Sequence, residues 1–167
     1  FSLRKLPQQP DAPTLPKSIR DTANELADQY PVTAGTILFN LLPPDIRSGS
    51  LPYPACITKV HDEETIPKLL TAQSSERYVL YQSIIRSTFA KKGSVLFIVP
   101  TNADIQTAVD RLKKGIDKRL VVFHSSQAKG SRGKAYQTLS DDEQTKLIIT
   151  TPSHAFVDRA DVATIII

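Results

Sequence analysis

A short basic segment, Lys129-Gly130-Ser131-Arg132-Gly133-Lys134, holds the residues of this chain best suited to binding phosphate. Lysine and arginine side chains neutralise phosphate charge, a serine hydroxyl can donate to a phosphate oxygen, and glycines permit close backbone approach. The segment lies in residues 111–134, where eight basic residues and one acidic residue give a net charge of +7, against +4 for the whole chain. This excess favours a polyanionic partner. The alternative is a solvated helix face followed by a plain loop.

The other reactive side chains make weaker cases. His124 and Ser125 could suggest nucleophilic catalysis, but neighbouring side chains at a strand end point apart, which favours a structural loop. His61 precedes the acidic run 62–64, yet adjacent residues do not converge on one ion, which favours a solvated turn over a metal site. The single cysteine, Cys56, excludes an internal disulfide and a cysteine-rich zinc site. No metal site is expected.

The stretch Thr71-Ala72-Gln73-Ser74-Ser75-Glu76-Arg77-Tyr78 stands between an apolar pair and a helical pattern. A nucleotide-binding enzyme carries its phosphate-binding glycine loop at such a place. That loop needs glycines because its backbone N–H groups must turn onto phosphate oxygens, in conformations that side chains obstruct. This stretch has the position of the loop and none of its glycines.

The composition predicts a folded protein with a sizeable core. Hydrophobic residues make up 40% and charged residues 23% of the 167 residues. No apolar run approaches the roughly 20 residues of a membrane span, and no secretory signal is visible. We therefore expect a cytoplasmic protein with no membrane partner. The chain lacks methionine and ends in an apolar run, so we expect it to be a fragment.

Apolar periodicity predicts a small helical segment followed by an α/β region. Helices are expected over residues 16–30 and 33–42, and a connection over residues 45–68 with one strand over 55–60. From residue 69 onward, the expected strands are 69–70, 94–99, 120–123, 146–150 and 162–167. The expected helices are 79–91, 102–116 and 134–145, with a polar basic loop over 125–134.

Apolar strands separated by helices are typical of a parallel sheet covered on both faces. Ligands of such sheets bind beyond the carboxyl ends of the strands. The loops that matter for function are therefore 71–78, 100–104, 124–133 and 150–156.

Six short segments stand in a telling order: ELADQY and LLPP near the N-terminus, then LYQSIIR, SVLFIVP, VVFHS and TTPSHAF. Taken in this order, they resemble the first motor lobe of superfamily 2 helicases, and in particular the PriA family of bacterial replication-restart helicases. The resemblance covers residues 15–48 and 66–167. It implies an α/β fold, a RecA-like parallel sheet with helices on both faces, preceded by a small helical segment.

The resemblance also implies a domain organisation. Residues 1–48 are similar to the end of the family's N-terminal DNA-binding region, and residues 49–65 would be a linker. Residues 66–167 would be the first helicase lobe, truncated before the acidic D-E-x-H motif that activates water. The resemblance implies that the second lobe, which supplies an arginine finger in this superfamily, is expected to lie outside these residues.

The family's P-loop implies ATP and Mg²⁺ as cofactors, and this chain departs from it at every key position. Thr71, Ser74 and Glu76 replace glycines, Arg77 replaces the lysine, and Tyr78 replaces the residue that binds magnesium. Ser75 lies inside the same stretch. Glu76 would place a carboxylate beside the triphosphate, and arginine is not a neutral replacement for lysine. We therefore expect a degenerate nucleotide site at residues 71–78.

Three hypotheses follow. The first is a divergent DNA-binding or primosome-scaffolding helicase lobe with a degenerate ATP site. The second is a piece of an active ATP-dependent helicase, and the third is an unrelated doubly wound domain. For the first, the expected partners are the phosphate backbone of branched or single-stranded DNA and primosome or single-strand-binding proteins. The expected DNA-binding residues are Lys129, Ser131, Arg132, Lys134, Thr151 and Ser153, the last two carried over from the family's T-x-S motif.

Overall fold

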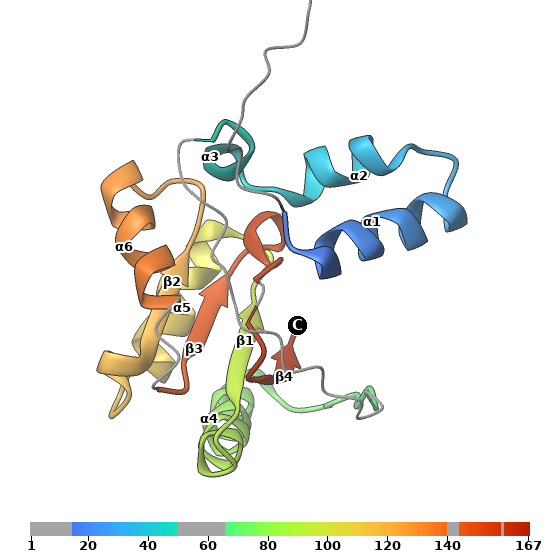
Figure 1. Ribbon diagram of the computed structural model, residues 1–167. Coiled ribbons are helices and arrows are strands. Elements are labelled where there is room, and N and C mark those ends of the chain that lie inside the picture. The colour runs from blue at the N-terminus through green and yellow to red at the C-terminus, as the bar shows by residue number, and fades with distance from the viewer. Residues whose placement is uncertain (1–14, 50–65, 140–143, 158) are drawn as a thin grey trace, which may run out of the picture.

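The computed structural model describes residues 15–49, 66–139, 144–157 and 159–167. It is an α/β structure built on one four-stranded, all-parallel sheet (Figure 1). This confirms the fold class expected from the alternation of apolar strands and helices. The strand expected over residues 55–60, Cys56 and the acidic run 62–64 lie outside the described residues.

The sheet has the strand order β2-β3-β1-β4, with β1 and β3 in the middle. The strands are β1 (Ser94–Ile98), β2 (Leu120–Phe123), β3 (Leu147–Thr150) and β4 (Val162–Ile166). All four residues of β3 are buried, since this strand has a neighbour on each side and a covered face above and below. The continuous apolar pattern that predicted these strands is explained by that burial.

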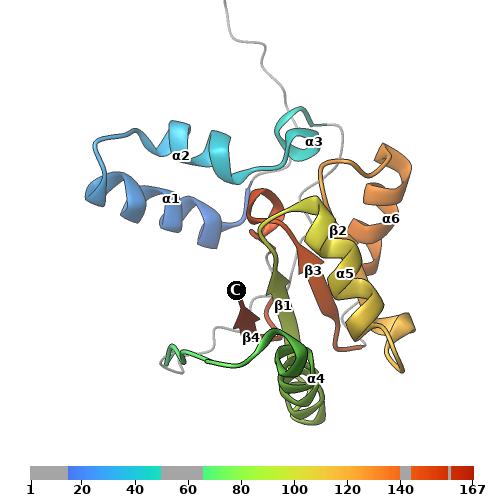
Figure 2. The same ribbon diagram turned by 180° about the vertical axis from the view of Figure 1, so that it is seen from behind.

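Helices cover the two faces of the sheet (Figures 1 and 2). Side chains alternate along each strand, so Val95, Phe97 and Ile149 join one core with α4 (Ser74–Ala90) and α5 (Asn102–Leu112). The residues that alternate with these along the strands, such as Leu96 and Ile148, face the other side of the sheet. There they form a second core with α6 (Lys129–Leu139).

A small helical segment precedes the sheet, as expected. It comprises α1 (Lys17–Gln29), α2 (Ala34–Leu41) and the short α3 (Pro44–Arg47). The Thr33 hydroxyl accepts a hydrogen bond from the Thr36 N–H and caps α2. Helices α1 and α2 pack on each other, and α2 contacts the 3₁₀ turn η2 (Pro152–His154), which follows β3. The helical segment therefore lies over the carboxyl ends of the strands (Figure 1).

Three expectations about elements were wrong. Leu69 and Leu70 form no strand and are 93% and 50% exposed, because the described sheet offers them no pairing partner. Helix α4 starts at Ser74 and not at 79, so most of the expected glycine-loop position is helical.

The basic segment is helical too, because α6 spans Lys129–Leu139 where a loop was expected up to residue 134. Ala135, Tyr136 and Leu139 pack against the sheet, and this packing outweighs the low helix propensity of Gly130 and Gly133. In the ranges that the structure describes, we find no helix long and apolar enough to cross a membrane.

Candidate functional site

The loops that follow β1, β2 and β3 meet at the carboxyl edge of the sheet, beside the helical segment. β1 and β3 are the two middle strands of the sheet. The chain passes from β1 to β2 at one edge of the sheet and from β3 to β4 at the other edge, so the two connections run in opposite directions. In open parallel sheets, ligands bind where the strand order reverses in this way. We therefore take the carboxyl edge as the candidate functional site.

The loops after β1 and β2 are joined by hydrogen bonds. The Asn102 side-chain amide donates to the Ser125 and Ser126 hydroxyls, at 3.2 and 3.0 Å. Next to it, Thr101 and Asp104 form a reciprocal capping box that starts α5. Thr101 thus serves as the N-cap of α5.

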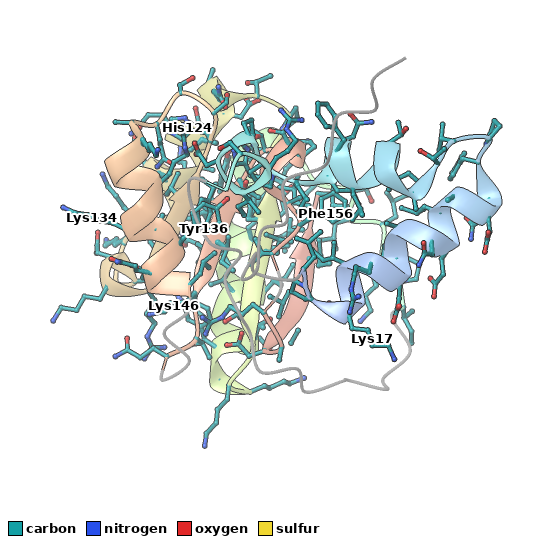
Figure 3. The ribbon with its side chains drawn as sticks, turned by 45° about the horizontal axis from the view of Figure 1, so that its top comes forward. Lys17, His124, Lys134, Tyr136, Lys146 and Phe156 are labelled. Carbon is teal, nitrogen blue, oxygen red and sulfur yellow. The ribbon has the colours of Figure 1, made fainter. Side chains whose placement is uncertain are left out.

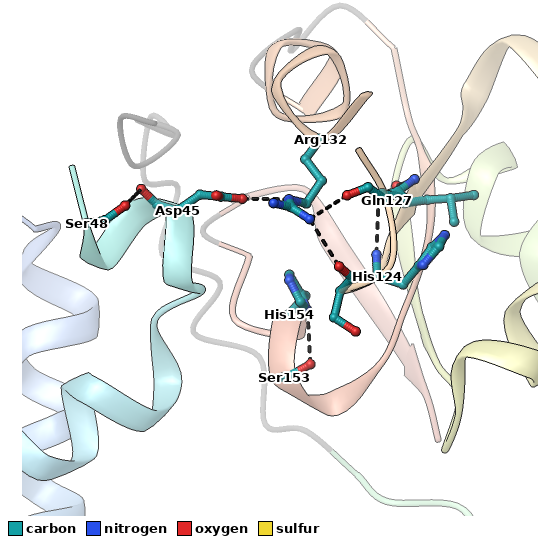
Figure 4. Close-up of polar contacts among 9 residues, drawn as sticks. Asp45, Ser48, His124, Gln127, Arg132, Ser153 and His154 are labelled. Atoms are coloured by element: carbon teal, nitrogen blue, oxygen red, sulfur yellow. Dashed lines mark hydrogen bonds and ion pairs between the residues drawn. The ribbon is translucent and has the colours of Figure 1, made fainter. Parts of the chain in front are cut away.

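Arg132 connects the helical segment to this edge (Figure 4). Its Nε donates to the Asp45 carboxylate of α3 at 2.6 Å, and its Nη1 donates to the carbonyls of Ser125 and Gln127. Both charged side chains are mostly buried. Arg132 therefore fixes α3 against the loop after β2, and its guanidinium is engaged inside the molecule.

His154 lies in the 3₁₀ turn after β3 and is 6% exposed. Its Nδ1 is 3.0 Å from the Ser153 hydroxyl, which in turn lies 3.1 Å from the Thr151 hydroxyl. Burial lowers the pKa of His154, and the nearby charge of Arg132 lowers it further, while Asp45 acts in the opposite direction. The surroundings of His154 therefore favour the neutral imidazole over the imidazolium.

His124 and Tyr136 extend the polar group from β2 and α6 (Figures 3 and 4). The His124 Nδ1 is buried and has no hydrogen-bond partner among the described residues. Burial raises the pKa of Tyr136 to about 12, and the Asp45 carboxylate adds to that shift. The two histidines, Arg132 and Asp45 thus influence one another electrostatically.

The expected DNA-binding residues fall into two groups. Lys129, Ser131 and Lys134 are exposed on α6, and Lys134 points away from the molecule in Figure 3. Thr151 and Ser153 belong to the His154 group at the carboxyl edge. Arg132 comes from the same helix as the lysines, but its side chain faces inward toward Asp45.

The expected nucleotide-binding stretch lies elsewhere. Ser75, Glu76 and Arg77 are exposed in the first turn of α4. Tyr78 packs edge-on against Tyr81 and lies 5.8 Å from the guanidinium of Arg111.

Arg111 belongs to the last turn of α5, which begins at the carboxyl end of β1 and runs back toward the other end of the sheet. Tyr78 therefore lies away from the loops of the candidate site, and Figure 1 shows α4 at the end of the sheet far from α3. Thr71 precedes the helix in the same region and is exposed.

Sequence reasoning did not single out Asp45 or Gln127, and it expected Asn102 only as the cap of the helix after β1, a role that Thr101 has instead. Asp45 and Arg132 are 87 positions apart, so no local pattern links them. The one available signal was the position of Asn102 and Gln127 in loops that follow predicted strands. Sequence reasoning did place those loops at the carboxyl edge of the sheet.

In the part of the chain that the structure describes, no group of His, Cys, Asp and Glu side chains could hold a metal ion. No protein-family model, curated protein or solved structure matches this chain.

Proposed function

We propose that this chain is a DNA-binding or primosome-scaffolding lobe of a replication-restart protein similar to the PriA family. The observation that carries the proposal is the exposure of Lys129 and Lys134 on α6. No acidic side chain among the described residues pairs with either lysine. Two lysines that are exposed on the same helix and lack an acidic partner there suit the phosphate backbone of DNA. Contacts to that backbone do not depend on the base sequence.

The basic surface continues along the chain before β2. Lys114 and Lys118 are exposed near the 3₁₀ turn η1 (Asp117–Arg119), which leads into β2, the strand that α6 follows. Lys113 is already paired with Asp110 at 3.0 Å, and Arg132 with Asp45. The exposed lysines that have no acidic partner among the described residues therefore lie on the segments before and after β2, where the DNA backbone would bind.

The proposal assigns no ATPase step to this chain. A P-loop needs glycines and a position at the carboxyl edge, where a helix N-terminus can face the phosphates. The stretch at residues 71–78 contains no glycine. It also starts a helix whose Tyr78 packs near the last turn of α5, away from the carboxyl edge.

Binding of a labelled forked DNA, measured by fluorescence anisotropy over a series of salt concentrations, tests this proposal. Each phosphate contact contributes about 0.7–0.9 to the slope of log K against log salt. We expect the Lys129→Ala/Lys134→Ala variant to lose about 1.4–1.8 of that slope. The matched control, Lys68→Ala/Lys91→Ala, removes two exposed lysines far from α6 and should keep the wild-type slope.

Two outcomes would refute the proposal. One is an absence of salt-dependent binding by the wild-type chain. The other is an equal loss in both double variants, because that would reflect total charge and not a site on α6.

A further inference from the structure

Strand β2 is an edge strand, with β3 on one side only. Backbone groups of alternate residues in a strand point to opposite sides. The N–H groups of Val95 and Val99 donate to the carbonyls of Lys146 and Thr150, so the even-numbered residues of β3 face β1. The odd-numbered residues of β3 therefore face β2.

The register of the strands then fixes which groups of β2 are free to pair outward. Val121 lies beside Ile148, so the backbone groups of Val121 and Phe123 face β3. The groups of Leu120 and Val122 point to the open side.

Part of this open edge is already occupied from within the chain. The Leu120 N–H donates to the Asp117 carbonyl. The Gln127 side-chain amide donates to the Val122 carbonyl at 3.0 Å and accepts from the His124 N–H at 3.2 Å. Gln127 thereby makes the two hydrogen bonds that one residue of a neighbouring parallel strand would make.

One pairing position remains between these two. The structure gives the Leu120 carbonyl and the Val122 N–H no hydrogen-bond partner among the described residues. They have the same spacing as the pair that Gln127 engages, so they can take one residue of an added strand. Backbone groups left unpaired in this way are a template for pairing with another chain.

A groove of about 280 Å³ runs beside this position. β2 forms one wall, and Ser131, Ala135 and Thr138 of α6 line the other. These three side chains are small and recur along one face of the helix, so they leave room for the alternate side chains of an extended segment.

We propose that the open edge of β2 binds an extended acidic peptide by strand addition. The backbone of the peptide would pair with Leu120 and Val122, and its side chains would enter the groove, as in other β-augmentation sites. This site shares Lys118 and Lys134 with the proposed DNA contacts but differs from them in its main hydrogen bonds, which come from the backbone of β2.

The charge around the groove favours an acidic partner. Asp117 lines one end of the groove, but most of the residues that form its walls lie within residues 111–134, whose net charge is +7 and whose Lys118 and Lys134 are exposed. A second copy of this chain is a poor occupant, because edge-to-edge pairing would bring two segments of net charge +7 together. A free acidic strand meets no such repulsion.

Nuclear magnetic resonance on the chain tests the site with defined probes. The first probe is a capped peptide of alternating glutamate and valine, and the second has lysine in place of glutamate. The third is the glutamate peptide with every backbone nitrogen methylated. We expect the first probe to shift the Val122 amide resonance and to slow its hydrogen exchange, with affinity about tenfold above that of the lysine peptide. The methylated probe should not bind.

A substitution distinguishes groove binding from general charge attraction. Ser131→Tyr, at an exposed helix position, should fill the groove and abolish the Val122 shift. Ser83→Tyr, at an exposed position on α4, is the control and should leave it unchanged.

The proposal fails if the methylated or lysine peptide binds equally well, or if Ser131→Tyr keeps full binding. It also fails if Val122 is protected by forked DNA alone. Concentration-dependent dimers that protect Val122 without peptide would assign the edge to a second copy instead.

Discussion

His154 is a titrating residue at the carboxyl edge whose surroundings lower its pKa and so disfavour the charged imidazolium. It is almost fully buried, and burial is the largest cause of its lowered pKa. The positive charge of Arg132 and the nearby His124 also disfavour a second proton, and only Asp45 opposes them. The described hydrogen bond of the ring joins Nδ1 to the Ser153 hydroxyl, and the tautomer of the imidazole decides which of the two is the donor.

We expect this environment to make folding sensitive to acid. The ordinary pKa of histidine, 6.5, applies to the unfolded chain, whereas the folded pKa is lower. As pH falls below 6.5, the unfolded chain takes up the proton first, so the free energy of unfolding decreases, by at most about 1.4 kcal/mol per pH unit. Above that pH the effect vanishes.

Urea unfolding of the wild type and His154→Gln between pH 5 and pH 8 checks this expectation. The wild type should lose stability faster than the variant on the acidic side, whatever the offset between them at pH 8. Parallel curves over the whole range would show that His154 is not the group responsible.

Arg77 stands at the position of the P-loop lysine, so it is the residue whose substitution tests for a nucleotide site. Its side chain is exposed in the first turn of α4, with Glu76 next to it. We expect no saturable binding of a fluorescent Mg-ATP analogue up to millimolar concentration, with or without forked DNA, and no difference in Arg77→Ala. Saturable binding that Arg77→Ala abolishes would instead favour the helicase hypothesis.

At the scale of elements, the start of α5 positions the loop after β1. The Thr101 hydroxyl accepts a hydrogen bond from the Asp104 N–H at 3.3 Å, and the Asp104 carboxylate accepts one from the Thr101 N–H at 3.1 Å. The next residue, Asn102, reaches across to the serines after β2. The cap therefore stabilises both the helix and the link between the two loops.

Thr101→Ala should lower the free energy of unfolding by about 1 kcal/mol, since it removes the N-cap oxygen. Thr107→Ala, at an exposed position inside the same helix, is the control and should cost nothing, because alanine has the higher helix propensity. Urea unfolding measures both. Equal stabilities of the two variants would mean that the cap contributes little to this fold.

Elements with continuous apolar patterns could be predicted from the sequence, and elements held by distant contacts could not. β1 and β3 were predicted because burial on both faces leaves an uninterrupted apolar run. The start of α6 was missed because its glycines and lysines resemble a loop, and only packing on the sheet makes it helical. The pairing of Arg132 with Asp45 joins segments 87 positions apart and leaves no local signal.

At the scale of the whole molecule, two partly buried ion pairs among the described residues hold the sheet from opposite ends. Arg132 and Asp45 join the helical segment to the carboxyl edge. At the amino edge, Arg159 pairs with Asp161 at 2.6 Å and also donates to the carbonyls of Leu139 and Gln144. The Ser94 hydroxyl donates to the same Asp161 carboxylate, which links the start of β1 to the approach to β4.

The pair at the amino edge should be the more costly one to break. The Arg159 side chain is 1% exposed, so Asp161→Asn would remove the carboxylate charge that two Asp161 oxygens place beside a buried guanidinium. We expect a loss of about 3 kcal/mol in the free energy of unfolding, near the lower end for buried pairs because Asp161 is itself 30% exposed. Replacing both residues at once, Arg159→Met with Asp161→Leu, should cost less than Asp161→Asn alone, because no buried charge is left unpaired.

Lys113→Ala, which breaks an exposed pair with Asp110, is the control and should cost under about 1 kcal/mol. If Asp161→Asn were no worse than this control in urea unfolding, the connections at the amino edge would not depend on the charge of that pair.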